Sequence, residues 1–159
     1  MAATPRVAAP SRSAASGLAG RPVLLATLRV PFAPAACEIA VDAAVESGQP
    51  LLVVVLAALP PLPLSVLLGY DQIDSPEEAA AFAAPAALAA SLGVAVERLR
   101  VRSPRPLVAL LELVSEREPG LLVFGPDRAL LSPRLYRTAA KTVREHAPCL
   151  VWVDDLLRS

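Results

Sequence analysis

Short aliphatic runs alternate with longer stretches of helical character, and this alternation constrains the fold more than any other feature of the chain. The runs expected to be strands are 23–27, 51–57, 94–102, 121–124 and 150–153. The stretches expected to be helices are 34–47, 76–92, 107–117 and 133–146. Strands that alternate with helices predict a parallel sheet with helices on both of its faces and right-handed crossovers.

The length of 159 residues suits one domain, which we place at residues 21–159. Residues 1–20 are rich in Ala, Ser, Gly and Pro, and no acidic residue precedes Glu38. Their composition resembles that of a transit peptide, but we interpret them as a flexible tail outside the fold.

Two helices have clear start signals, and one has an internal breaker. Ser75 and Ser132 are each followed by proline, the arrangement of an N-cap and the first helical position. Pro85 predicts a break or kink in the helix over 76–92.

The segment 47–70 carries no charge, and its apolar stretch 50–70 is long enough to cross a bilayer. Three prolines, Pro60, Pro61 and Pro63, would leave backbone groups unsatisfied in lipid. We therefore expect a buried strand followed by a Pro-rich loop, and no stable membrane insertion.

Fifteen basic and fifteen acidic side chains give a net charge of zero. This balance argues against a protein built to grip nucleic acid or an anionic membrane. Lys141 is the only lysine among the basic residues, a bias typical of GC-rich bacterial genomes. Cys37 and Cys149 lie far apart without a CxxC motif, so we expect two buried thiols in a reducing, cytoplasmic setting and no metal site.

Three segments of the C-terminal half carry a resemblance to a known family. They are Gly93-Val-Ala-Val-Glu97, Pro119-Gly-Leu-Leu-Val-Phe-Gly125, and His146-Ala-Pro-Cys149 followed by Leu-Val-Trp-Val. In this order they resemble the universal stress protein family, over residues 21–153. The resemblance implies a doubly wound sheet of five parallel strands in the order 3-2-1-4-5.

The resemblance also implies a phosphate-binding loop after the fourth strand, of the form G-x2-G-x9-G-[S/T]. Glycines let the loop amides approach the phosphates, and the following helix adds its N-terminal dipole. Gly125 matches the first glycine and Thr138 the hydroxyl residue, but Arg128 and Arg137 stand at or beside the other glycine positions. The candidate binding residues are Gly125, Asp127, Arg128, Ser132, Arg137 and Thr138.

A second departure lies at the end of the first strand, where Leu28 replaces the family's carboxylate. We therefore expect no resident cofactor, with ATP or AMP as the alternative ligand. Three arginines, 128, 134 and 137, could bind an anion by charge. Their competing interpretation is solvation, or pairing with Asp127 and Glu145.

Both expected sheet edges carry distinctive residues. Arg98, Arg100 and Arg102 share one face of the third strand, where charge would block wrong pairing, or, as the alternative, would bind an anion or nucleic acid. The edge strand Leu150, Val151, Trp152 and Val153 has no charge or proline, so we expect it to pair with a second copy in a homodimer. The alternative packs Trp152 under the C-terminal tail.

The remaining polar residues favour structural roles. We expect His146 to cap a helix C-terminus, and Glu38, Asp42 and Glu46 to form one solvated helix face. The chain shows no Walker-type loop, nucleophile elbow or metal motif.

Three functions remain open. The first is a stress-response binding or regulatory module without a reaction of its own. The second is a nucleotide-binding protein with weak ATPase activity. The third is an accessory domain that docks on a membrane transporter or kinase through the Pro-rich segment 59–68.

Overall fold

The computed structural model describes residues 20–58 and 76–154. Three features of the sequence lie outside these residues: most of the N-terminal tail, the cap at Ser75, and the Pro-rich segment 59–68. The elements follow the expected order of alternating strands and helices. The expected α/β architecture is confirmed.

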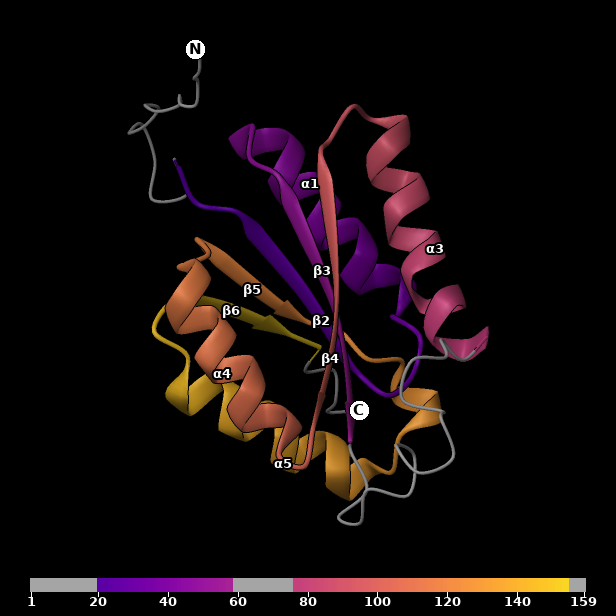
Figure 1. Ribbon diagram of the computed structural model, residues 1–159, viewed down its shortest axis with the longest axis vertical. Helices are drawn as coiled ribbons and strands as arrows, with labels where there is room; N and C mark the ends of the chain where they lie inside the picture. Colours follow the sequence, from indigo (N-terminus) through magenta and orange to yellow (C-terminus); the bar gives the residue numbers. More distant parts are fainter. Residues whose placement is uncertain (1–19, 59–75, 155–159) are drawn as a thin grey trace.

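A five-stranded parallel sheet forms the centre of the molecule (Figure 1). Its strands are β2 (Val23–Leu28), β3 (Leu51–Ala58), β4 (Val96–Ser103), β5 (Leu121–Phe124) and β6 (Leu150–Val153). The order β4-β3-β2-β5-β6 is the expected 3-2-1-4-5 when strands are counted along the chain. The first strand is therefore central, paired with β3 on one side and β5 on the other.

Helices cover both faces of the sheet (Figure 1). They are α1 (Pro34–Ser47), α3 (Pro76–Ser91), α4 (Pro106–Arg117) and α5 (Pro133–His146). Side chains of α1 and α3 pack against one face, and those of α4 and α5 pack against the other. A single turn of 3-10 helix, η2 (Arg128–Leu130), lies between β5 and α5.

Alternate residues of each central strand enter different cores, as the two-residue period of a strand requires. Val23 and Leu25 of β2 face α1 and α3, whereas Leu24, Ala26 and Leu28 face α4 and α5. All six residues of β2 are buried. This burial on both faces explains why the strands appear in the sequence as unbroken aliphatic runs.

Two expectations about α3 and β4 need correction. Of the break or kink expected at Pro85, the break is absent: α3 continues through this residue, and alanines, the best helix formers, flank it. Strand β4 begins at Val96 rather than Val94, because the amide of Val94 donates to the carbonyl of Ala89 and closes α3. Gly93 supplies the left-handed conformation (φ +78°) that this closing turn requires.

The two sheet edges are the strands expected from the sequence, β4 and β6. Arg98 and Arg100 are exposed on β4 and Arg102 is partly exposed, in agreement with their predicted place on an edge. Leu150 of β6 is 69% exposed, and Trp152 is half-buried against the core beneath α1 and α3.

None of the helices within residues 20–58 and 76–154 has both the length and the apolar character needed to cross a membrane.

Candidate functional site

The loop after β5 begins at Gly125, which is buried beneath the start of α1. A Cβ placed on Gly125 would collide with the Cβ of Ala36. The φ of Gly125 does not lie in the left-handed region, so its backbone could be adopted by other residues. Close packing of α1 on the end of β5 therefore requires glycine at this position.

The amides of this loop donate to acceptors within the protein. Gly125 N donates to Ala26 O at 2.9 Å, and Asp127 N donates to Pro31 O at 2.9 Å. Further along, the amides of residues 129, 130 and 131 donate to the Asp127 side chain, the Asp127 carbonyl and the Arg128 carbonyl. Pro126 has no N–H. A phosphate-binding loop works by directing such amides at its ligand, whereas here the amides of residues 125, 127, 129, 130 and 131 donate to protein acceptors.

The loops after β2 and β5 are joined to each other at the carboxyl end of the sheet. Phe32 and Pro126 form an isolated antiparallel bridge, and Ala33 N donates to Gly125 O at 2.9 Å. In doubly wound sheets this point, where connections leave for opposite faces, is where ligands bind. Here the protein's own main chain links the two sides.

The end of β2 offers no carboxylate to this region. Leu28 is only 3% exposed and packs in the core beneath α4 and α5. Arg29 follows with a left-handed backbone (φ 66°), and its amide donates to Leu56 O at 2.8 Å. The hydroxyl of Thr27 is buried and donates to Val30 O at 2.7 Å.

Arg128, which we expected at the second glycine position of a phosphate-binding loop, is held by an aromatic ring and a carbonyl. Its Cζ lies 4.5 Å from the centroid of the Tyr136 ring, and its Nη1 donates to Asp154 O at 3.2 Å. The Tyr136 hydroxyl donates to the same carbonyl at 2.9 Å and accepts from Asp154 N at 3.1 Å. We call Arg128, Tyr136 and Asp154 the Arg128 clasp. It joins η2, α5 and the end of β6.

The other candidate residues do not converge on one centre. Asp127 caps η2, and Ser132 caps α5 by accepting from Leu135 N at 3.1 Å. Arg137 and Thr138 are exposed on the second turn of α5, where backbone amides are already used within the helix. The structure thus brings Gly125, Asp127 and Arg128 together in one loop, whereas Arg137 and Thr138 lie on the surface of α5.

We expected the loop arginines to pair with Asp127 or Glu145. Arg128 instead contacts Tyr136 and Asp154. Asp127 is used as a cap, and Glu145 lies 4.0 Å from the Nζ of Lys141. Tyr136 and Asp154, the residues that hold Arg128, were not among the residues predicted from the sequence. The inward position of Tyr136 on the apolar face of α5 was a usable signal, whereas the contact with Asp154 depends on tertiary packing.

Residues assigned to structural roles behave as expected. The Nδ1 of His146 lies 3.0 Å from the carbonyl of Thr142, which confirms the expected cap of the last helical turn. Glu38, Asp42 and Glu46 are exposed along α1, which confirms a solvated face. Within the described residues, no group of three or more His, Cys, Asp or Glu side chains could hold a metal ion.

The two cysteines are free thiols in different surroundings. Cys37 is buried in α1, and burial raises its pKa to about 11. Burial also raises the pKa of Cys149, although this side chain is only half-buried. The expectation of two buried thiols therefore holds for Cys37 and only in part for Cys149.

These features define a doubly wound α/β protein with a loop at the switch point of its sheet. A model of the universal stress protein family matches residues 20–154, and the chain belongs to that family. No curated protein matches the chain.

Solved structures show the same fold. A universal stress protein family protein from Burkholderia pseudomallei is 18% identical with a TM-score of 0.61, covering 88% of this chain and 98% of its own. UspA from Lactobacillus plantarum is 18% identical with a TM-score of 0.61, covering 84% and 96%. An Archaeoglobus fulgidus universal stress protein in complex with dAMP is 20% identical with a TM-score of 0.51, covering 84% and 96%.

Proposed function

We propose that the chain is a binding or regulatory module of the stress response that does not hold ATP in its β5–α5 loop, and that it has no reaction of its own. The main observation in support of this proposal is that amides of the loop donate hydrogen bonds to acceptors within the protein. Gly125, Asp127 and the three residues of the loop from 129 to 131 all direct their N–H groups at protein acceptors. Binding phosphates there would require these hydrogen bonds to break.

The side chains around the loop support the same proposal. The Arg128 clasp fixes a bulky side chain where the family has glycine. Leu28 stands buried where the family has a carboxylate. Both departures remove contacts that the family uses for nucleotide.

The alternative function is binding of a nucleotide such as ATP or AMP, with weak hydrolysis. It is supported by the dAMP complex of a protein with the same fold. Two exposed arginines near the start of α5, Arg134 and Arg137, offer guanidinium groups that suit phosphate. Binding of this kind would rest on charge rather than on loop amides.

We further propose that the module works as a homodimer through β6. This strand lies at the edge of the sheet, and its exposed Leu150 is apolar. A two-fold copy of the same strand would cover both features.

Calorimetric titration with ATP and with AMP tests the proposed function. We expect no measurable heat from the wild-type protein at ligand concentrations of about 1 mM. Arg134→Gln and Arg137→Gln provide the control for binding by charge. Binding that these substitutions abolish would support the alternative, and binding that survives them would show that the loop itself accepts nucleotide.

A further inference from the structure

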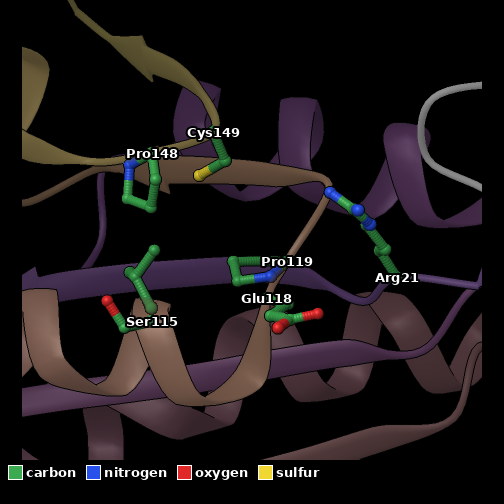
Figure 2. Close-up of a pocket in the computed structure, with 7 residues that line it drawn as sticks. Arg21, Ser115, Glu118, Pro119, Pro148 and Cys149 are labelled. Atoms are coloured by element: carbon green, nitrogen blue, oxygen red, sulfur yellow. The ribbon is translucent and has the colours of Figure 1, made fainter.

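A second concave site lies at the opposite end of the sheet from the β5–α5 loop. It is a pocket of about 230 Å³ lined by Arg21, Val114, Ser115, Glu118, Pro119, Pro148 and Cys149. Some of these residues directly precede β2, β5 or β6, and the others lie at the C-terminal end of α4. The pocket therefore lies at the amino ends of the strands. Figure 2 shows the residues before β6 on one wall and the end of α4 on the other. Ligands of doubly wound folds normally bind at the carboxyl ends, so this pocket is a separate feature.

One wall of the pocket is electronegative. Glu118 closes α4 with a left-handed backbone (φ 50°), and its amide donates to Val114 O at 2.9 Å. The next carbonyl, that of Ser115, would take its helical donor from position 119, where proline has no N–H. A helix C-terminus and a carboxylate on the same wall favour a bound cation.

The other wall carries a positive charge. Arg21 precedes β2, and its charge opposes the effect of burial on the pKa of Cys149, so the guanidinium lies near that thiol. Among the described residues, neither Arg21 nor Glu118 takes part in an ion pair. Arg21 and Glu118 therefore place opposite charges on two sides of the pocket without forming an ion pair with each other.

The remaining lining is largely apolar and the volume is small. Pro148 is exposed and Pro119 is buried at the edge of the pocket, whereas the Val114 side chain is 0% exposed and lies behind this surface in the core. The pocket is open to solvent on one side, and at roughly 30 Å³ for each water-sized group its volume of about 230 Å³ accommodates about eight non-hydrogen atoms. An aliphatic α-amino acid such as valine fits within this space, whereas most of a nucleotide would remain outside it.

We propose that this pocket binds a small zwitterion of the amino-acid class, with its ammonium group at Glu118 and the end of α4, its carboxylate at Arg21, and its aliphatic body against the two prolines. The assignment follows from the charge on each wall and from the volume. It does not depend on whether the β5–α5 loop binds nucleotide.

Cys149 supplies a reporter inside the pocket. In a Cys37→Ala background, the rate of alkylation of Cys149 by neutral iodoacetamide would be measured with L-valine, isobutylamine or isovalerate. We expect saturating valine to slow alkylation at least threefold. The amine and the acid each lack one of the two charged groups, so we expect little protection from either at the same concentration.

Two variants locate the effect and two matched variants control for it. We expect Glu118→Gln and Arg21→Gln each to raise the Kd of valine at least tenfold. Glu116→Gln and Arg105→Gln change exposed charges on or beside α4 that do not line the pocket, and should leave the Kd unchanged. Thermal unfolding of each variant confirms that it is folded.

Three results would overturn the proposal. The first is the absence of protection by valine at about 50 mM, a concentration at which even very weak binding is detected. The second is equal protection by isobutylamine or isovalerate. The third is protection that is unchanged in both pocket variants.

Discussion

Gly125 illustrates what a single residue in this chain does and does not reveal. Its place after an aliphatic run marked it as a special position in the sequence, and the family pattern assigned it to a phosphate loop. The structure adds a packing reason, because the Cβ of Ala36 occupies the space that a side chain at position 125 would need. That reason was hidden in the sequence, since the two residues belong to elements far apart along the chain.

The packing role of Gly125 predicts a rescue. Gly125→Ala should lower the free energy of unfolding by about 1–3 kcal/mol, because the new methyl group overpacks the contact with α1. Adding Ala36→Gly should restore part of this loss, so that the double variant is more stable than the sum of the single effects by about 1 kcal/mol. Urea unfolding of the four proteins measures this coupling. Purely additive effects would show that the contact is not the reason for glycine.

The Arg128 clasp predicts a second coupling. Tyr136→Phe should cost about 1–2 kcal/mol, because the amide of Asp154 loses its acceptor and the carbonyl loses one donor. Arg128→Met should cost less in the Tyr136→Phe background than in the wild type. Arg134→Met, on the exposed first turn of α5, is the control and should change stability by less than about 0.5 kcal/mol. If urea denaturation gave Tyr136→Phe the same free energy of unfolding as the wild type, the clasp would not contribute to stability.

At the level of elements, the hydrophobic pattern predicted each described strand and α-helix and their order. The predicted bounds were wrong where backbone hydrogen bonds determine the end of an element. Val94, for example, closes α3 instead of starting β4. Of the break or kink expected at Pro85, the break is absent, because the surrounding alanines are strong helix formers and the helix continues to Ser91. The short helix η2 was not foreseen, since its cap by Asp127 is a local choice among several turns.

Helix α4 and strand β4 are joined by an exposed ion pair between Arg117 and Glu97, with two N–O distances of 2.9 and 3.0 Å. Hydrogen bonding by Arg117 holds the pKa of Glu97 below its ordinary value of 4.5. A lowered carboxyl pKa stabilises the fold above that value, and the contribution is lost as the pH falls through the pKa of the folded state.

The substitution Glu97→Gln should therefore reduce stability at neutral pH by less than about 1 kcal/mol, because the pair is exposed and screened. The difference from the wild type should vanish as the pH falls well below 4.5, and should shrink in about 1 M salt. Chemical denaturation across pH provides the measurement. A difference that persisted after Glu97 is protonated in the folded state would show that charge pairing is not its source.

At the scale of the whole molecule, the sequence predicted the sheet order through a family resemblance, and the structure confirms it. It also located both edges of the sheet. The contact between the loops after β2 and β5 could not be predicted from the sequence, because it depends on main-chain contacts between segments distant in the chain.

The position of β6 at the edge of the sheet predicts a dimer of two 16.6 kDa chains. Light scattering at tens of micromolar should give twice the chain mass. Leu150→Lys should shift the protein toward monomer by placing a charge on the 69% exposed edge residue, whereas Leu130→Lys, at a similarly exposed leucine on η2, should not. A monomeric wild-type protein would refute the pairing.

The protein's own groups occupy the switch point between β2 and β5. A crystal structure grown with excess ATP would show whether they can be displaced. We predict that the Phe32–Pro126 bridge and the Arg128 clasp remain intact and that no nucleotide density lies beside Gly125. Nucleotide bound between opened loops, with Arg128 displaced from Tyr136, would contradict the account.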